Sequence, residues 1–257
     1  MKIFNVINIV HFTSKNFQNL LVIFEKILIK LFDVNSYINI KKNKEFLDKN
    51  AISFKKFAIN KNKKLFFETI SVSKKIRENG LKILYKKRIK NHGGAAIEII
   101  YFLIRYYKPK IILETGVAYG FSSHSIFHAI KKNKLGKLYS SDFPYFREKN
   151  PEKLIGVVVP KKFKHNWNLF INGDKNNLKK IYLKTKEVNF IHYDSDKSYF
   201  GRYRFMKNIN KFKKIKFILM DDLHNNVFFY DYIKKNNIKK FKVFFYKKHY
   251  VGLIFTN

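Results

Sequence analysis

The segment from residue 111 to 123 constrains the fold of this chain most strongly. It reads IILETGVAYGFSS, an apolar run that ends in an acid, followed by a short loop with a glycine at each end and then by serines. A short apolar run of this kind is typical of a buried parallel strand, and the serines suit the first turn of a helix. The glycines let the backbone turn sharply and let a ligand approach closely. The segment therefore predicts a strand, a ligand-binding loop and a helix.

The spacing of the two loop glycines distinguishes between classes of cofactor. Three residues separate Gly116 from Gly120, and Ala118 stands where a dinucleotide fingerprint has the glycine that faces the pyrophosphate. A nicotinamide or flavin dinucleotide is therefore disfavoured relative to a cofactor without a pyrophosphate. Taken by itself, the loop is equally compatible with an ordinary structural turn.

Strand and helix patterns alternate beyond this loop. Further strands are predicted at 137–142, within 164–173, at 188–193 and at 217–220, and a closing hairpin at 241–246 and 250–255. Such alternation is the pattern of a parallel sheet covered on both faces. The predicted fold class is therefore α/β: a Rossmann-like, doubly wound sheet, mostly parallel with a C-terminal antiparallel hairpin, plus an N-terminal helical extension.

The chain of 257 residues has room for one α/β domain and this extension. Residues 1–90 are lysine-rich, carry apolar residues at helical intervals and are predicted to form the helical extension. Residues 91–257 are predicted to form the α/β domain. A turn signal at 91–94 and a helix pattern over 95–107 mark its start.

The apolar run at 20–32 is interrupted by Glu25, Lys26 and Lys30, so it is too short and too charged to span a bilayer. An amphipathic helix that packs on the domain is the favoured interpretation, and a helix on a membrane surface is the alternative. The start of the chain does not have the pattern of a signal peptide, so a cytoplasmic location is expected.

The formal net charge of +36 raises the question of an anionic partner. A basic surface is typical of nucleic-acid binding. However, only six of the 54 basic residues are arginine, so the guanidinium groups that bind phosphates and base edges are scarce. Nucleic acid is therefore disfavoured, while attraction to anionic lipid or polysaccharide stays open. The absence of cysteine excludes disulfides and thiolate metal sites.

Acidic residues stand at the ends of four predicted strands. They are Glu114, Asp142, Asp194 and the pair Asp221 and Asp222. The carboxyl ends of parallel strands share one crevice, where ligands bind. A single acid at such a position is typical of a helix N-cap. Their repetition in a chain with only 18 acids favours one shared site.

On these motifs, the chain from about residue 92 to its end resembles the class I S-adenosylmethionine-dependent methyltransferases. It is similar to the metal-dependent O-methyltransferases of the catechol and caffeoyl-CoA type and to the macrocin O-methyltransferase and cephalosporin-hydroxylase-like group. The resemblance covers about two thirds of the chain. It implies transfer of a methyl group from S-adenosylmethionine to a hydroxyl oxygen of a small-molecule or glycan-like acceptor.

The resemblance also implies a set of cofactor-binding residues. The loop matches the pattern E-x-G-x-x-x-G-x-S, in which the glycines lie against the methionine part of the cofactor and the serine meets its carboxylate. Asp142 is expected to accept hydrogen bonds from both ribose hydroxyls, which suits the two oxygens of a carboxylate. The implied set is Glu114, Gly116, Gly120, Ser122, Asp142, Asp174 and Asp194, with Asp174 on the adenine side.

Asp194, Asp221 and Asp222 resemble the metal-binding motifs of these enzymes, and their hard oxygen donors suit Mg²⁺. An ion at this position stabilises the alkoxide of an acceptor hydroxyl. Lys197 matches the lysine that acts as general base in the catechol-type enzymes, a role that requires a lowered pKa. The macrocin-like group often has histidine there, so His224 stays open as an alternative base or substrate contact.

Two other functions stay open from the sequence. One is a non-catalytic or metal-independent Rossmann-like protein that binds an anionic polymer. The other is a sugar- or metabolite-modifying enzyme on the cephalosporin-hydroxylase-like scaffold. Peripheral contact with a membrane and formation of a homodimer are open as well.

Overall fold

The computed structural model describes residues 2–14, 16–89, 94 and 96–256, and every structural statement below concerns these residues. The turn predicted at 91–94 falls mostly outside this set. An eight-stranded sheet lies at the centre of the molecule, in the order β1-β7-β8-β6-β5-β2-β3-β4. The strands are β1 Ala51–Ser53, β2 Ile111–Thr115, β3 Lys137–Ser141, β4 Asn168–Phe170, β5 Phe190–Tyr193, β6 Phe217–Met220, β7 Phe241–Tyr246 and β8 His249–Phe255.

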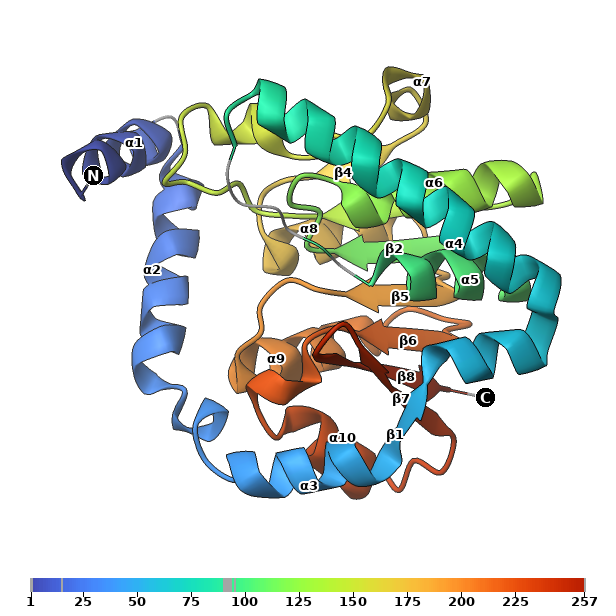
Figure 1. Cartoon of the computed structure of the whole chain (residues 1–257). Coiled ribbons are helices and arrows are strands. Elements are labelled where there is room, and N and C mark those ends of the chain that lie inside the picture. The colour runs from blue at the N-terminus through green and yellow to red at the C-terminus, as the bar shows by residue number, and fades with distance from the viewer. Residues whose placement is uncertain (1, 15, 90–93, 95, 257) are drawn as a thin grey trace.

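Helices lie on both faces of the sheet (Figure 1). The helices are α1 Lys2–Ser14, α2 Phe17–Phe32, α3 Ile40–Asn50, α4 Phe54–Lys86, α5 Ile97–Tyr107, α6 Phe121–Asn133, α7 Lys161–Lys164, α8 Asp174–Lys184, α9 Tyr199–Ile209 and α10 Phe228–Lys235. Short 3-10 turns are η1 Val34–Ser36, η2 Pro151–Leu154 and η3 Leu223–Asn225. α4, α5 and α6 pack on one face, and α8, α9 and α10 pack on the other.

The pairing of the strands confirms the predicted fold class. β2 is parallel to both β3 and β5, and β5 is parallel to β6. β8 is antiparallel to β6 and to β7, so the C-terminal hairpin closes the parallel part of the sheet. The result is a mostly parallel, doubly wound, Rossmann-like sheet, as the alternation of strand and helix patterns predicted.

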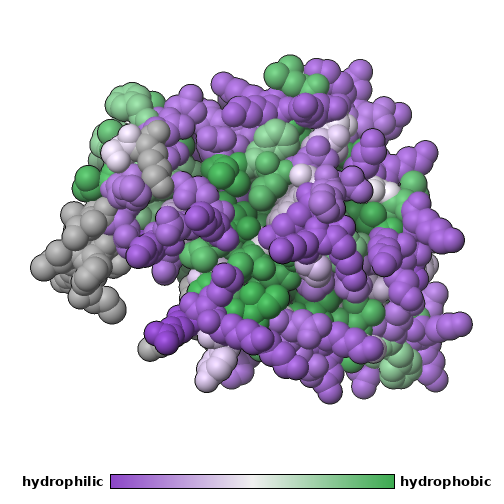
Figure 2. Space-filling model, turned by 90° about the horizontal axis from the view of Figure 1, so that it is seen from above, coloured by the Kyte–Doolittle hydropathy of each residue, from purple (hydrophilic) through white to green (hydrophobic). Residues whose placement is uncertain are grey.

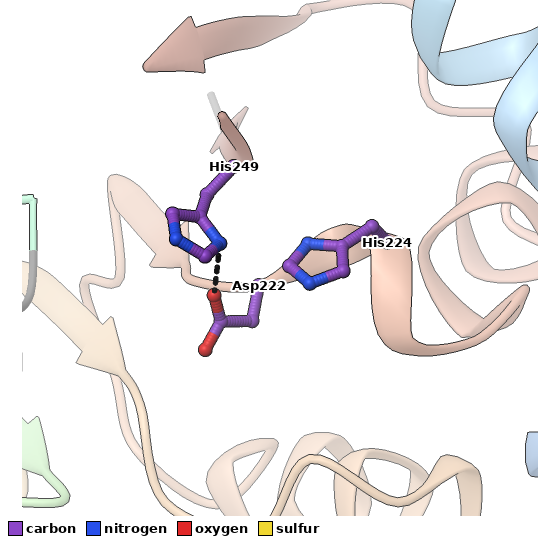
Figure 3. Close-up of side chains that lie close together, drawn as sticks. All are labelled: Asp222, His224 and His249. Carbon is purple, nitrogen blue, oxygen red and sulfur yellow. Dashed lines mark ion pairs between the residues drawn. The ribbon is translucent and has the colours of Figure 1, made fainter. Parts of the chain in front are cut away.

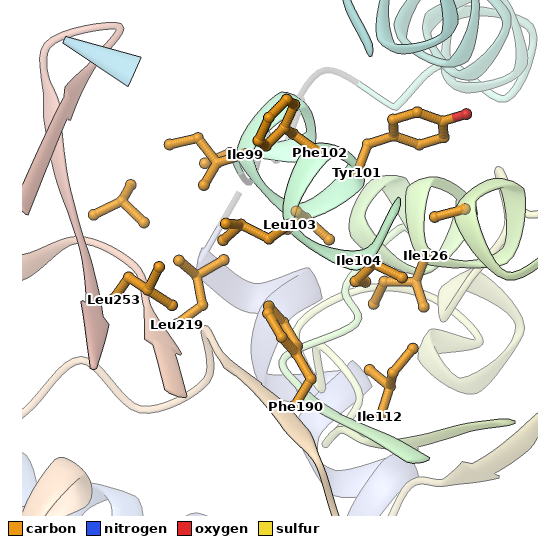
Figure 4. Packing of buried hydrophobic residues seen from close by; sticks show 14 of the residues in the cluster. Ile99, Tyr101, Phe102, Leu103, Ile104, Ile112, Ile126, Phe190, Leu219 and Leu253 are labelled. Carbon is orange, nitrogen blue, oxygen red and sulfur yellow. The ribbon is translucent and has the colours of Figure 1, made fainter. Parts of the chain in front are cut away.

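The core is built around α5, which is apolar on almost every side. All residues from Ile97 to Ile104 are buried, because α5 lies between the sheet and the helices α4 and α6. Figure 4 shows Leu103 of this helix on the side that faces Leu219 and Leu253 of the sheet. A helix buried on all sides needs no polar face, which explains the apolar run from Ile99 to Ile104.

The N-terminal part of the chain is joined to the sheet. β1 pairs in parallel with β7, with Ile52 opposite Phe244, and the ring of Phe54 packs against Phe102 and Phe244. β1 thereby covers part of the edge of β7 that would otherwise expose unpaired backbone groups. The α4 segment is interrupted by non-helical backbone at Asn62, whose side chain caps the second part. A domain boundary near residue 90 stays a prediction.

The apolar run at 20–32 forms helix α2, which crosses the carboxyl ends of the central strands (Figure 1). In the part of the chain that the structure describes, no helix combines the length and the apolar character needed to cross a bilayer. Hydrophilic side chains cover most of the face shown in Figure 2, and hydrophobic side chains remain visible between them. This distribution agrees with lysines spread along the whole sequence.

Candidate functional site

A cavity of about 610 Å³ lies at the carboxyl ends of the parallel strands. Its volume is in the range of sites for small ligands, and its position is where open α/β sheets bind them. Every predicted site residue lines this cavity except Glu114 and the alternative base His224. Residues Val22, Glu25, Lys26 and Ile29 of α2 complete the wall.

The loop after β2 depends on its two glycines. Gly116 has a φ of +81°, and a Cβ there would lie 2.3 Å from the backbone oxygen of Asp194. Gly120 has a φ of +97°, and its Cβ would lie 2.7 Å from the Cα of Gly156. Both positions therefore exclude other residues through backbone conformation and through close packing. Ser122, in the first turn of α6, is buried and lines the cavity beside the helix N-terminus, where unpaired amides favour an anionic group.

Replacing Gly116 by alanine is expected to lower the free energy of unfolding by about 3 kcal/mol, because left-handed strain and a backbone clash add. Gly173→Ala is the matched control: its φ is +79°, but the nearest atom to the added Cβ is 3.4 Å away. Because its ψ of 152° places Gly173 in a backbone region essentially restricted to glycine, the control is expected to lose about 2 kcal/mol, from backbone strain alone. Denaturant unfolding of both variants measures the difference, and equal losses would contradict the close approach.

Glu114 lies beneath the loop and outside the cavity wall. Its carboxylate accepts hydrogen bonds from the hydroxyls of Ser123 (2.6 Å) and Ser140 (2.8 Å), and the side chain is fully buried. The predicted role of Glu114 as a cofactor contact therefore differs from its position in the structure. There it joins β2 to β3 and to α6, and so fixes the glycine loop from below.

Asp142, directly after β3, presents its carboxylate to the cavity. Its two oxygens accept hydrogen bonds from the backbone amides of Ala118 (2.8 Å) and Phe143 (2.7 Å). Burial raises the pKa of Asp142 to about 7, and the charges of Asp174 and Glu114 add to this, although the two amides act in the opposite direction. Each carboxylate oxygen keeps a second lone pair, so the group can still accept hydrogen bonds from a diol.

The raised pKa of Asp142 predicts a pH-dependent affinity for S-adenosylhomocysteine. The ionised carboxylate accepts hydrogen bonds from the ribose hydroxyls, and the protonated form accepts them poorly. Affinity is therefore expected to rise roughly tenfold between about pH 6 and about pH 8, through the pKa of about 7. Calorimetry across this range tests it. An unchanged pH profile in Asp142→Asn would mean that another group titrates.

Asp174 begins α8 on the same wall. It accepts hydrogen bonds from the hydroxyls of Ser141 (2.6 Å) and Ser195 (2.5 Å). Burial raises its pKa, and these hydroxyls oppose the shift. Asp174 thus lies beside the cavity as the sequence predicted, and in this structure it ties the end of β3 to the loop after β5.

Lys197 lies between the carboxylates of Asp194 and Asp222. Its ammonium forms ion pairs with Asp194 and, at 2.6 Å, with Asp222. Burial lowers the pKa of Lys197, but the charges of Asp194, Asp222 and Asp221 outweigh it and raise the pKa overall. Burial and the charge of Asp221 raise the pKa of Asp194 to about 6, against the effect of Lys197. In this arrangement Lys197 is charged, which is the opposite of what a general base requires.

Asp221 is buried beside a histidine that the sequence analysis did not single out. The Nε2 atom of His192 lies 4.0 Å from Asp221, and its Nδ1 atom lies 4.0 Å from Glu114. Desolvation lowers the pKa of His192, but the carboxylates of Asp221, Asp194 and Glu114 outweigh it and raise the pKa. Burial raises the pKa of Asp221, whereas His192 and Lys197 lower it overall. The sequence signal that could have pointed to His192 is its position as a polar residue within the otherwise apolar strand before Asp194.

Arg202 holds the backbone that carries the two adjacent aspartates. Its Nη2 atom donates hydrogen bonds to the backbone oxygens of Asp221 (3.1 Å) and Asp222 (2.7 Å), and the side chain is fully buried. By sequence alone, residues 199–204 are predicted to form a solvated helix face, and binding of an acidic acceptor by Arg202 is the alternative. The buried position shows instead that Arg202 supports the site from behind.

Asp222 also belongs to a second group, of which Asp222 and His249 line the cavity and His224 does not. Asp222 has a left-handed φ of +52°, and its carboxylate lies 3.4 Å from the Nδ1 atom of His249. His224 lies on the other side of Asp222, and the two imidazole centroids are 5.2 Å apart (Figure 3). One ligand atom from each of these three residues lies within 4.8 Å of the others.

Another group of possible metal ligands consists of His192, Asp194 and Asp221, and one ligand atom from each of them lies within 4.8 Å of the others. The three predicted metal ligands are thus divided between two groups, with Lys197 next to both. The metal set Asp194, Asp221 and Asp222 stays a prediction. His249, the first residue of β8, had no sequence signal, because only the hairpin brings it to Asp222.

Several solved structures that are similar to this one are methyltransferases. An O-methyltransferase from Bacillus cereus in complex with S-adenosylhomocysteine is 14% identical, with a TM-score of 0.54, over 71% of this chain and 91% of the other. The O-methyltransferase from Streptomyces achromogenes involved in tomaymycin synthesis, in complex with S-adenosylmethionine, is 12% identical, with a TM-score of 0.53, over 71% and 90%.

The chain has the fold of these O-methyltransferases. A methyltransferase from Geobacter sulfurreducens shares it too, at 12% identity and a TM-score of 0.50, over 70% of this chain and 87% of the other. No family model matches the chain, and no curated protein matches it in sequence. At this level of identity the likeness establishes the architecture, and the activity has to be argued from the side chains.

Proposed function

We propose that the protein is an S-adenosylmethionine-dependent methyltransferase that acts on a hydroxyl oxygen of a small-molecule or glycan-like acceptor, with a divalent metal ion. The observation that carries the proposal is the convergence of the glycine loop, Asp142 and the acidic residues after β5 and β6 on one cavity. The shared fold with S-adenosylmethionine- and S-adenosylhomocysteine-bound O-methyltransferases supports it.

The residues present fit the cofactor. Gly116 and Gly120 line the cavity with backbone alone, so a ligand can lie close to this loop. Ser122 and the N-terminus of α6 suit the carboxylate of the methionine part. Asp142 suits the ribose diol, because each of its oxygens can accept one further hydrogen bond. When bound, the cofactor supplies the methyl group from its sulfonium.

The donor groups also fit a hard divalent ion. Asp194 and Asp221 lie in one donor group and would hold it. Asp222 lies in the other group and would join them on the side where the ammonium of Lys197 now lies between Asp194 and Asp222. A bound Mg²⁺ would lower the pKa of an acceptor hydroxyl. His192 and Arg202 keep Asp221 and the Asp221–Asp222 backbone in place behind it.

Two residues are candidates for the general base that takes the proton of the acceptor hydroxyl. The Nζ atom of Lys197 qualifies only when a cation neutralises the carboxylates that hold it charged. His224 is the alternative, since partial burial lowers its pKa and leaves it neutral at physiological pH, although Asp222 acts in the opposite direction. Holding donor and acceptor in near-attack geometry supplies the main part of the rate enhancement.

Calorimetry with S-adenosylmethionine, with and without Mg²⁺, tests the proposal. It is followed by incubation with a panel of catechols and polyhydroxylated sugars and by mass spectrometry for a product heavier by one methyl group. We expect cofactor binding without the metal and methylated product only with it. Failure to bind either S-adenosylmethionine or S-adenosylhomocysteine would refute the proposed function.

One observation favours a second candidate, a hydroxylase that uses iron. Asp222, His224 and His249 form a group of two histidines and one carboxylate, the ligand set of non-haem iron oxygenases. Anaerobic titration with Fe²⁺ tests this candidate on the variant that combines His224→Asn with His249→Asn. His165→Asn, a change at an exposed histidine, is the matched control. Tight iron binding that only the double variant loses would favour the hydroxylase over the methyltransferase.

A further inference from the structure

Helix α2 turns its most apolar side toward solvent. Seven large apolar residues recur at intervals of three and four along the helix and therefore form one continuous stripe. The α2 stripe consists of Phe17, Leu20, Leu21, Phe24, Ile27, Leu28 and Leu31. All seven side chains are exposed, Phe24 to 57% and Leu31 to 68%. An amphipathic helix of a globular domain buries such a stripe, so this orientation is the reverse of the usual one.

Polar contacts fix α2 in this orientation. Glu25 forms an ion pair with Arg204 of α9 and lies 3.9 Å from the Nζ atom of Lys175 on α8. Just beyond the helix, the carboxylate of Asp33 accepts a hydrogen bond from the amide of Phe200 (3.1 Å). These contacts hold the side opposite the stripe against the domain, so the stripe faces outward.

The α2 stripe is part of a larger apolar surface. The structure describes 24 exposed large apolar side chains, and twelve of them lie between residues 17 and 40. Beyond the stripe, this segment adds Phe32, Val34, Tyr37, Ile38 and Ile40. Exposed apolar side chains concentrated in this way mark a surface that binds another protein or a membrane.

The charge around the stripe indicates which of these partners binds it. Residues 1–44 contain seven lysines and only two acids, Glu25 and Asp33. Both acids are engaged in contacts with the domain, while Lys41, Lys42 and Lys44 are exposed just beyond the apolar surface. A second copy of this chain would bring another +36 and repel the first. The headgroups of an anionic bilayer attract the same lysines.

We propose that α2 docks on the surface of an anionic lipid bilayer. The α2 stripe enters the boundary between headgroups and acyl chains, and the lysines contact lipid phosphates. The opposite side of α2 lines the cavity through Val22, Lys26 and Ile29, so docking holds the cavity next to the membrane surface. This inference does not depend on the reaction at the cavity.

Co-sedimentation with lipid vesicles tests the docking surface. The full chain is mixed with phosphatidylcholine vesicles with and without phosphatidylglycerol. We expect strong binding to the anionic vesicles only, weakened by salt. The variant that combines Phe24→Ser with Leu31→Ser is expected to lose binding at least tenfold, on the order of the loss of two buried apolar side chains. Leu183→Ser, a change at a side chain of α8 that is 77% exposed, is the matched control and is expected to bind as the wild type does.

Two results would overturn the docking surface. Undiminished vesicle binding by the double variant would mean that lysines alone attract the protein. A dimer in lipid-free solution, measured by light scattering and converted to a monomer by the double variant, would mean that a second copy covers the stripe. Leu20→Ser with Leu28→Ser repeats the test on the same stripe. Circular dichroism checks that each variant is folded, which is expected because all four side chains are exposed.

Discussion

Asp142→Asn is expected to weaken the binding of S-adenosylhomocysteine roughly 100-fold, because hydrogen bonds to a charged group contribute about 1.5 to 3 kcal/mol each. The carboxylate lines the cavity between the glycine loop and the residues after β3. An amide offers one oxygen in place of two, so one of the ribose hydroxyls and one backbone amide lose their acceptor. Calorimetry without metal measures the change.

Asp231→Asn is the matched control for this experiment. Asp231 is an acid of α10 outside the cavity, and it accepts a hydrogen bond from the hydroxyl of Tyr199 (3.0 Å). The substitution changes the net charge by the same amount as Asp142→Asn. We expect the control to keep wild-type affinity. Equal weakening in both variants would mean that overall charge, and not a ribose contact, determines affinity.

Asp221→Asn is expected to lower the rate of methyl transfer by about three orders of magnitude and to leave cofactor affinity within about threefold of the wild type. The proposed metal ion supplies several kcal/mol of charge stabilisation, and each 1.36 kcal/mol corresponds to about a factor of ten in rate. Asparagine keeps an oxygen for the amide of Ala96, 3.4 Å from the carboxylate, so the local fold is retained.

Treatment of the wild type with a chelator is expected to reproduce the effect of Asp221→Asn, and added Mg²⁺ to restore the rate. Mass spectrometry of the product and calorimetry with S-adenosylhomocysteine separate turnover from binding. Full turnover in the presence of the chelator would remove the metal from the proposed mechanism while leaving the cofactor site intact.

The parallel core of the sheet was predictable because its strands carry strong local signals. Phe217–Met220 is an apolar run between lysines and two aspartates, and β6 begins and ends where that pattern does. β1 was not predicted, since Ala51–Ser53 is too short to show a pattern. Its pairing with β7 depends on residues nearly 200 positions away, so only the folded chain forms that strand.

The location of the site was predictable from the sequence, but the contacts among its residues were not. Asp142, Asp194 and Asp221 each follow the last residue of a strand, and all three reach the cavity. Glu114 lies one residue before the end of β2 and remains beneath the loop. The strand boundary therefore separates acids that face the ligand from an acid that supports the fold. Predicting it requires bounds accurate to one residue, which sequence patterns do not provide.

The sequence by itself determined the alternation of strands and helices, and therefore the sheet, its carboxyl edge and the acids gathered there. Hydrophobic periodicity and glycine conformation act over a few residues, so they are present in the local sequence. Only the tertiary structure decided that Lys197 lies between Asp194 and Asp222, that His249 meets Asp222, and that α2 faces solvent with its apolar stripe. These contacts depend on packing between segments that are distant in the sequence. The direction in which a side chain points and its charge state are set there by neighbours that no local pattern encodes.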